Sequence, residues 1–326
     1  MSKNNSNTWQ LEGSISLLQQ RAFLLSTIRQ FFAARNVLEV ETPVLSSAGN
    51  TDVQIDMFTS LSINDDKQLS YLRTSPEFFH KRLLANGAGD IFEIAKVFRL
   101  GESTRLHNPE FTLLEWYRLD FEMSQLMTEV LELVQYVRQQ FGLDAMPINT
   151  YSYQQIFTDH LTIDPFNISD EKLNQLACEA GYHGDKLNRT AALDFMFALQ
   201  LEPKLEKDQG YLIYDFPVEQ AALSQVHAKH PDRCLRFEFL WGGVELANGY
   251  QELTDADEQL KRFEQDNLNR QAMGKTELPI DHKLIDALKK GLPDCSGVAV
   301  GVDRLLMCLL GSDDIDEVLA FNFDGS

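Results

Sequence analysis

The sequence predicts an α+β fold in which an antiparallel β-sheet is flanked by helices. Three observations carry this prediction. Strand patterns occur in pairs that suit hairpins, helical patterns lie beside them without a β-α-β-α alternation, and no internal repeat is present. With 326 residues, 44% of them hydrophobic and 24% charged, the chain is also long enough to bury a substantial core.

The first expected elements are a helix and a short strand. Residues 1–14 are expected to form a flexible tail, and Met1–Thr8 lacks the apolar segment of a secretory signal. From Ile15 to Ala34 apolar residues recur at helical spacing, which predicts a helix. Val37–Val40 then predicts a strand that stops at Thr42-Pro43, because proline cannot donate a ladder hydrogen bond.

A second helix, a pair of strands and a long helix are expected next. The segment Thr74-Ser75-Pro76-Glu77 combines a capping residue, a proline and an acid, which together indicate the start of a helix running to Leu84. Asp90–Leu100 and Phe111–Leu119 predict two strands joined by a charged loop, and Ser124–Gln140 predicts a helix. Residues from about 150 to 205 carry helical patterns and turn signals, so a helical insertion is expected there.

The last third of the chain returns to strands and ends in a buried helix. The expected strands are Tyr211–Phe216, Leu235–Trp241, Val244–Tyr250 and Gly297–Val300. The pair Gly242-Gly243 predicts a tight hairpin turn between two of them. The expected helices are Asp255–Met273, His282–Lys290 and Val302–Leu310.

Charge and cysteine usage narrow the functional classes. With 29 Lys+Arg against 49 Asp+Glu the net charge is −20, which disfavours binding to a long nucleic-acid surface. No apolar run approaches the length of a membrane span. The four cysteines have no CxxC spacing, so neither a zinc site nor a disulfide framework is expected. Cys178, Cys234, Cys295 and Cys308 are therefore expected to be buried free thiols. A cytoplasmic location is expected for the protein.

Three stretches carry more than generic fold information. The first is the helix and strand ending at Pro43. The second is Phe98-Arg99-Leu100-Gly101-Glu102 with Arg105, His107, Asn108 and Pro109-Glu110-Phe111. The third is Gly297-Val298-Ala299-Val300-Gly301-Val302-Asp303-Arg304. In this order they resemble motifs 1, 2 and 3 of the class II aminoacyl-tRNA synthetases, a resemblance that covers about residue 15 to the end.

The resemblance extends to the lysyl-tRNA synthetase branch. The residues that show this resemblance are Ser75-Pro76-Glu77 with Lys81-Arg82-Leu83, the run from His107 to Tyr117, and the run from Glu245 to Asp255. It implies the class II catalytic fold over residues 15–326, a homodimer interface at motif 1, and an ATP site. The implied ATP-binding residues are Arg99, Leu100, Gly101, Glu102, Arg105, His107, Asn108, Phe111, Glu245, Leu246, Gly301 and Arg304.

The chemistry of adenylate formation fits these residue types. A carboxylate attacks the α-phosphate of ATP, so two anions approach and charge develops on phosphorus, which suits an arginine fork. The resemblance implies that Arg99 holds the carboxylate and α-phosphate and that Arg304 lies against the adenine and γ-phosphate, with Phe111 on the other face of the ring. Arg99 and Arg304 are therefore the catalytic candidates.

Two carboxylates suggest the amino-acid substrate. A lysine-like substrate has two ammonium groups, and Glu77 and Glu252 are the expected partners, with Tyr117 beside the distal group and Asn248 near the substrate carboxylate. Such a pocket argues against aspartate or asparagine. Glu77 would alternatively be a simple first-turn acid that complements the helix dipole. The residues implied to bind substrate are Ser75, Pro76, Glu77, Tyr117, Asn248, Glu252 and Ala299.

Magnesium is the expected metal, since it uses one or two carboxylates together with phosphate oxygens. Glu238 and Glu245 lie on the two arms of the predicted hairpin and are the expected ligands. Without the motif context the same residues would be two solvated strand carboxylates.

The acceptor is inferred from what precedes motif 1. Motif 1 begins almost at once, so no anticodon-binding domain is expected. The architecture therefore resembles the stand-alone elongation factor P–lysine ligases, which activate (R)-β-lysine and transfer it to a lysine of elongation factor P, and (R)-β-lysine or lysine is the expected substrate. tRNA binding is not expected. The alternatives are a minimal ligase with tRNA or a small amine as acceptor and a non-catalytic regulatory paralogue, although Arg99, Arg304, Glu238 and Glu245 are all retained.

Two departures from the synthetase pattern stand out. Gly101 lies where motif 2 usually has glutamate, with Glu102 one residue further on. Ala299 replaces a motif 3 glycine, and its methyl group is expected to disfavour an α-amino group and suit the β-isomer.

Overall fold

The computed structural model describes residues 14–61 and 69–323. Residues 1–13 of the expected N-terminal tail lie outside the described residues. Ser14 instead caps the first helix, its hydroxyl accepting a hydrogen bond from the Leu17 amide at 3.1 Å. The α-helices are α1 (Ile15–Ala33), α2 (Glu77–Ala85), α3 (Met123–Gln140), α4 (Tyr153–Leu161), α5 (Asp170–Glu179), α6 (Arg189–Met196), α7 (Ala256–Ala272), α8 (His282–Gly291) and α9 (Val302–Leu310).

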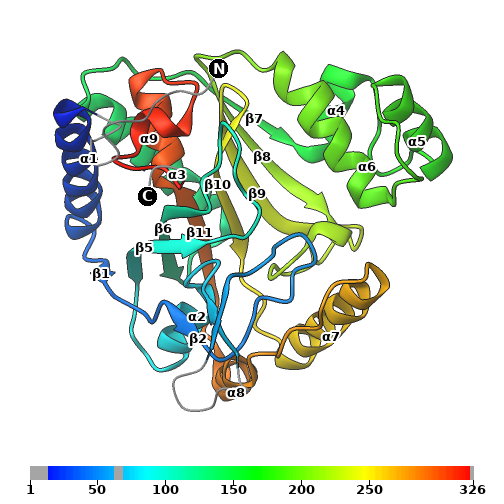
Figure 1. Ribbon diagram of the computed structural model, residues 1–326, viewed down its shortest axis with the longest axis horizontal. Coiled ribbons are helices and arrows are strands. Elements are labelled where there is room, and N and C mark those ends of the chain that lie inside the picture. The colour runs from blue at the N-terminus through cyan, green and yellow to red at the C-terminus, as the bar shows by residue number, and fades with distance from the viewer. Residues whose placement is uncertain (1–13, 62–68, 324–326) are drawn as a thin grey trace, which may run out of the picture.

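A large mixed sheet forms the centre of the molecule (Figure 1). Among the described residues it has eight strands in the order β1-β5-β6-β11-β10-β9-β8-β7. These are β1 (Leu38–Glu39), β5 (Ile91–Phe98), β6 (Glu110–Leu119), β7 (Ile148–Ser152), β8 (Gly210–Pro217), β9 (Arg233–Trp241), β10 (Val244–Gln251) and β11 (Cys295–Gly301). The six central strands are antiparallel as expected, but the two edge strands, β1 and β7, each pair in parallel with their neighbour.

The β9–β10 hairpin confirms the turn prediction. Trp241 pairs with Val244, so Gly242 and Gly243 form the two-residue loop, with φ values of 55° and 83°. A two-residue loop with positive φ at both positions is the turn that matches the twist of the flanking strands. A side chain at Gly242 would also collide with the backbone of Lys207, so the turn requires glycine twice over.

One face of the sheet is covered by α1, α3 and α9, which lie together in Figure 1. Their apolar residues pack against the buried sheet side chains Phe92, Trp116 and Val298. Trp116 is fully buried, and its ring N–H donates to Glu129 of α3 at 3.0 Å, which satisfies the polar atom inside this core. The predicted helices and strands of this region are therefore confirmed by a shared core.

The opposite face presents polar residues in register. Glu93, Glu115, Ala299, Asn248 and Glu238 are successive Cα partners across β5, β6, β11, β10 and β9. Partners across a sheet point to the same face. Residues that are widely separated in sequence are thereby brought to one surface.

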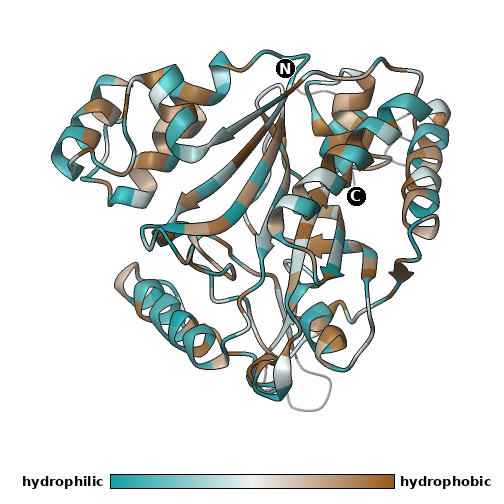
Figure 2. Cartoon of the chain, turned by 180° about the vertical axis from the view of Figure 1, so that it is seen from behind, coloured by the Kyte–Doolittle hydropathy of each residue, from teal (hydrophilic) through white to brown (hydrophobic). Residues whose placement is uncertain are grey.

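Two smaller units lie next to that surface, a group of three helices and a small sheet. Helices α2, α7 and α8 pack around a cluster that includes Leu84, Tyr117 and Phe263. Figure 2 shows hydrophilic residues along most of α7, as its charge-rich sequence predicts. A three-stranded sheet in the order β2-β4-β3, which the sequence analysis missed, precedes α2; its strands are β2 (Leu45–Ser46), β3 (Thr59–Leu61) and β4 (Leu69–Leu72).

The segment in which a helical insertion is expected lies beyond β7 and β8 and is helical over α4, α5 and α6 (Figure 1). Helices α4, α5 and α6 continue into a π-helical turn, η1 (Phe197–Leu201), and a 3-10 turn, η2 (Glu202–Lys204); the remaining 3-10 turns are η3 (Val218–Gln220) and η4 (Ile315–Val318). The insertion has its own apolar cluster around Tyr153 and Phe157. Its boundary differs from the expectation because residues 148–152 form strand β7.

The helices and the cysteines were also predicted to have particular environments. No helix within residues 14–61 and 69–323 is long and apolar enough to cross a membrane. All four cysteines are free, but Cys178 is exposed, so the expectation of burial is wrong for that residue. It lies on α5, at the surface of the insertion.

Candidate active site

A buried acidic pocket lies between α2 and the end of β10. Glu77 opens α2, Lys81 follows one turn later, and Glu252 immediately follows β10. The Lys81 ammonium lies 2.8 Å from Glu77 Oε1 and 2.6 Å from Glu252 Oε2, and Lys81 and Glu252 are both almost completely buried. The two expected substrate carboxylates therefore converge, and an internal cation joins them.

These groups keep unused hydrogen-bonding capacity. Lys81 pairs with one oxygen of each carboxylate, whereas Glu252 Oε1 and Asn248 Oδ1 are buried acceptors without a hydrogen-bond partner in the described part of the chain. Buried polar atoms are normally paired, so these two acceptors indicate a site for a ligand with N–H donors.

Burial controls the protonation of this pocket. Desolvation raises the pKa of Glu77 and of Glu252, although the charge of Lys81 opposes the rise in both. The pKa of Lys81 is raised despite its burial, because Glu252 and Glu77 stabilise the ammonium form. A cationic ligand would act on the two carboxylates in the same direction as Lys81.

The floor of the pocket is β11. A Cβ atom built on Gly297 would collide with the ring of Tyr117 and with the Glu252 carboxylate, so only glycine allows these two groups to lie where they do. Ala299, two residues later, has Glu115 and Asn248 as its register partners. Its methyl group therefore faces the same surface as those side chains.

The remaining residues of the predicted substrate group support the start of α2. The Ser75 hydroxyl accepts a weak hydrogen bond from the Glu77 amide at 3.4 Å, and Pro76 occupies the position before the first helical residue. Glu77 is the acid in the first turn of α2, so its alternative role beside the helix dipole coexists with its place in the pocket.

Arg304 of α9 links the motif 2 loop to β10. Its guanidinium donates to the backbone carbonyls of Leu106 at 3.2 Å and Glu245 at 3.0 Å and contacts the ring nitrogen Nε2 of His107. Burial and the neighbouring Arg304 charge lower the pKa of His107, so its neutral ring accepts this hydrogen bond. The other ring nitrogen then donates to the Thr104 hydroxyl, 2.7 Å away.

Arg99 lies beside the site at the end of β5. Its guanidinium carbon is 5.1 Å from the centre of the Phe111 ring, and its terminal nitrogen is 3.6 Å from Glu102. The Arg99 Nε atom is buried without a hydrogen-bond partner among the residues that the structure describes. Arg99 is thus held between Phe111 and Glu102 with one donor unused, and its role in binding a ligand stays a prediction.

The other predicted ATP-site residues differ in accessibility. Leu100, Gly101 and Arg105 are exposed on the motif 2 loop, and Gly101 has a φ of 84°. The buried Asn108 supports that loop, its amide donating to the Glu110 carbonyl at 2.6 Å. Leu246 is buried in the core on the other side of the sheet, and Gly301 directly precedes α9. The placement of adenine between Arg304 and Phe111 stays a prediction.

The expected metal ligands line one open pocket. Glu238 and Glu245 border a pocket with about 520 Å³ of empty volume, together with Arg236, Asp194 and Glu202. Burial raises the pKa of Glu238; the charge of Arg236 opposes this rise, and that of Glu245 adds to it. Within the described segments no cluster of three or more His, Cys, Asp or Glu could hold a metal by itself. Two carboxylates therefore fit Mg²⁺ only if phosphate oxygens complete its shell.

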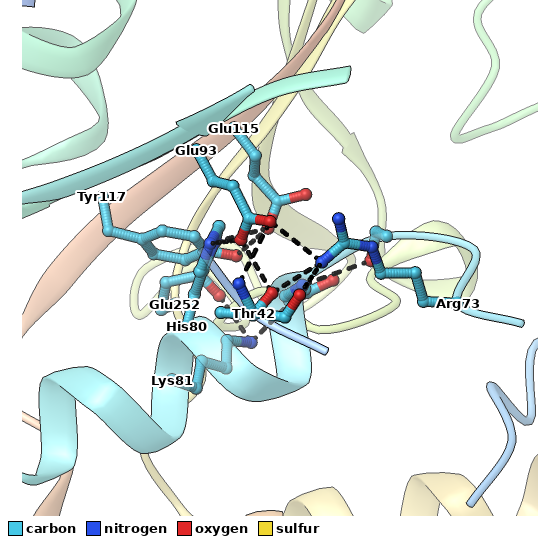
Figure 3. Close-up of polar contacts among 10 residues, drawn as sticks. Thr42, Arg73, His80, Lys81, Glu93, Glu115, Tyr117 and Glu252 are labelled. Carbon is cyan, nitrogen blue, oxygen red and sulfur yellow. Dashed lines mark hydrogen bonds and ion pairs between the residues drawn. The ribbon is translucent and has the colours of Figure 1, made fainter. Parts of the chain in front are cut away.

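A polar network that the sequence did not predict lies beneath the amino-acid pocket. His80, Glu93, Glu115 and Arg73 are all buried and connected by hydrogen bonds and ion pairs (Figure 3). One signal was available: Glu115 interrupts the otherwise apolar stretch from Leu113 to Tyr117. A charged residue within a buried strand almost always has a partner.

Comparison with known proteins places the chain in a family. The family model described as tRNA synthetases class II (D, K and N) matches residues 4–324. The chain belongs to this class II synthetase family. A Pasteurella multocida protein named elongation factor P–(R)-β-lysine ligase is 45% identical over 324 residues, which is 98% of each chain. Proteins of the same name from Salmonella arizonae and Salmonella heidelberg are each 45% identical over 323 residues, covering 97% of this chain and 98% of theirs.

This family membership confirms the predicted class II catalytic fold. The predicted motif 2 spans β5, its loop and β6, and the predicted motif 3 spans β11 and α9. The individual roles of the site residues remain predictions.

Proposed function

We propose that this protein activates (R)-β-lysine, or lysine, with ATP and transfers it to a lysine side chain of elongation factor P. The observation that carries the proposal is its 45% identity to elongation factor P–(R)-β-lysine ligases over nearly the whole of both chains. The buried carboxylates Glu77 and Glu252 support a substrate with two ammonium groups. The alternatives with tRNA, a small amine or no catalysis are not favoured by these relatives.

In the first step the substrate carboxylate attacks the α-phosphorus of ATP, and pyrophosphate leaves. Arg99 holds the two anions together and Arg304 neutralises charge on the phosphate chain. Glu77 and Glu252 bind the ammonium groups and so fix the position of the carboxylate. The protein thus contributes orientation and electrostatic stabilisation rather than a covalent intermediate of its own.

In the second step the acceptor amine, after loss of a proton, attacks the carbonyl carbon of the adenylate. The new amide bond forms and AMP leaves. Mg²⁺, held by Glu238, Glu245 and phosphate oxygens, would supply charge neutralisation at the phosphates.

We also infer a homodimer through motif 1 and a cytoplasmic location. Ile15, Leu38 and Leu45 are 66%, 54% and 47% exposed. Apolar side chains exposed within one segment are typical of a protein–protein interface. The four free cysteines support a reducing compartment.

The deciding experiment is the intact mass of purified elongation factor P after incubation with this protein, ATP, Mg²⁺ and either lysine isomer. We expect a gain of one lysyl unit, faster with the β-isomer, and no gain after chelation of Mg²⁺. Arg304→Gln should abolish ATP–pyrophosphate exchange, while Arg189→Gln, a substitution in the insertion, should not. Exchange without a mass gain would contradict elongation factor P as acceptor, and absence of exchange with every amino acid would contradict catalysis.

A further inference from the structure

A chain of alternating charges runs beneath the substrate pocket. It passes from Arg73 to Glu93, His80, Glu115 and then the Tyr117 hydroxyl (Figure 3). Each of these residues is at least nine-tenths buried, and His80 has no exposed surface. Such a chain excludes water, so its hydrogen-bond directions are fixed by its own members.

His80 donates in both directions. Its Nε2 lies 2.9 Å from Glu93 Oε2 and its Nδ1 lies 3.2 Å from Glu115 Oε1. A carboxylate only accepts hydrogen bonds, whereas a neutral imidazole has one donor and one acceptor nitrogen. The doubly protonated ring is the form that suits both contacts. Burial lowers the pKa of His80, but hydrogen bonds to Glu115 and Glu93 outweigh this effect and leave it raised.

Glu93 is anchored on its far side. Arg73 lies 2.9 Å from Glu93 Oε1, and the Thr42 hydroxyl donates to Glu93 Oε2 at 2.7 Å. Burial alone would raise the pKa of Glu93, but hydrogen bonds from His80 and Thr42 and the charge of Arg73 lower it. Glu93 therefore stays an acceptor for His80.

Glu115 connects His80 to Tyr117 in the substrate pocket. The oxygen that faces His80, Oε1, also accepts the hydrogen bond of the Tyr117 hydroxyl at 2.9 Å. Burial and then the nearby carboxylates raise the pKa of Tyr117 well above its usual value, so the hydroxyl keeps its proton. Because its single hydrogen is used, the Tyr117 oxygen offers only lone pairs to a ligand.

We propose that His80 is a positioning residue that fixes Tyr117 as a hydrogen-bond acceptor and thereby makes the pocket select an ammonium group over a neutral hydroxyl. The inference rests on the proposed function, in which Tyr117 and Glu252 meet the distal amino group of the substrate. With Tyr117 turned in this way, the Tyr117 oxygen and the Glu252 oxygen that is not paired with Lys81 both present lone pairs to the distal group. An ammonium supplies three hydrogens to them, but a hydroxyl supplies one and leaves buried acceptors unpaired.

Removing His80 should weaken this selection. In His80→Met, the buried Glu115 loses the hydrogen bond and the charge that hold Oε1 in place as the acceptor for Tyr117. The Tyr117 hydroxyl is then free to turn its hydrogen towards the ligand, where it opposes an ammonium. Glu93→Gln should act in the same direction but less strongly, since the His80 ring remains.

The test compares ATP–pyrophosphate exchange with the better lysine isomer and with its analogue in which a hydroxyl replaces the distal amino group. We expect the ratio of their kcat/KM values to fall about tenfold in His80→Met, the scale of one hydrogen bond to a charged group. The KM for ATP should not change. His183→Met removes an exposed histidine of the insertion and should leave the ratio unchanged.

Several outcomes would overturn the proposal. One is an unchanged ratio in folded His80→Met; another is an equal fall in His183→Met. If His80→Met fails to fold, Glu93→Gln carries the kinetic test, and an unchanged ratio there counts against the proposal. Nitrogen-15 NMR of the wild-type His80 ring gives a readout independent of activity. We expect both ring nitrogens to be protonated at neutral pH, and a singly protonated ring would refute the proposed role of His80. Absence of exchange with any lysine would instead refute the proposed function.

Discussion

Lys81→Met should destabilise the protein through the two carboxylates that it leaves behind. Lys81 is 1% exposed, and its ammonium contacts both Glu77 and Glu252. Methionine keeps the length of the side chain but removes the charge. Breaking a buried ion pair by removing one partner costs about 3–5 kcal/mol, because the other charge stays buried. We expect a loss of unfolding free energy in that range near pH 8.

The loss of unfolding free energy in Lys81→Met should increase as the pH rises. Burial raises the pKa of Glu252 from 4.5 to about 8, even with the opposing charge of Lys81, and the pKa of Glu77 is raised as well. Without Lys81 both values should rise further. A carboxyl group with a raised folded pKa contributes stability below its unfolded pKa and loses that contribution as the pH rises through the folded value. The deficit of Lys81→Met should therefore be smallest below about pH 4.5 and largest above about pH 8.

Urea unfolding of the wild type and the variant at several pH values measures this effect. Lys96→Met is the matched control, because Lys96 and Glu110 form an ion pair at 3.3 Å in which both side chains are 49% exposed. An exposed pair of this kind contributes at most about 1 kcal/mol. If Lys81→Met were no less stable than Lys96→Met at about pH 8, Lys81 would not stabilise the two buried carboxylates as we argue.

Two further predictions concern specificity and assembly. Ala299→Gly should lower the preference for β-lysine over α-lysine in ATP–pyrophosphate exchange, because the methyl group beside Asn248 and Glu115 is removed; an unchanged preference would contradict this role. Leu38→Asp should shift the protein towards a monomer in analytical ultracentrifugation, because it puts a charge into the exposed apolar segment of motif 1. Leu199→Asp, at a 52% exposed leucine of the insertion, should not, and equal behaviour of the two variants would argue against this interface.

The elements that local sequence predicted well are those with strong periodicity or strict turn chemistry. The helices α1, α3 and α9 have long apolar stripes, and Gly242-Gly243 specifies its turn by backbone conformation alone. The strands β2 and β3 were missed because they are two and three residues long and expose most of their side chains. Pattern reasoning has little to act on in such short segments.

Some residues of the candidate site could likewise be predicted from the sequence, and others could not. Motif residues such as Arg99, Glu77 and Arg304 could be selected from the sequence because their neighbours resemble a known family. His80 could not be selected, since its partners Glu93 and Glu115 lie on two other elements and nothing local to α2 indicates them.

The sequence by itself determined the family, the order of the motifs and the kinds of charged groups available to the site. Only the tertiary structure decided which charges meet. Glu77 and Glu252 are far apart in the chain, yet both contact Lys81, and the row from Glu93 to Glu238 exists only through the register of five strands. The physical reason is that local patterns fix backbone conformation, whereas the energy of a buried charge depends on partners that the fold alone brings within hydrogen-bond distance.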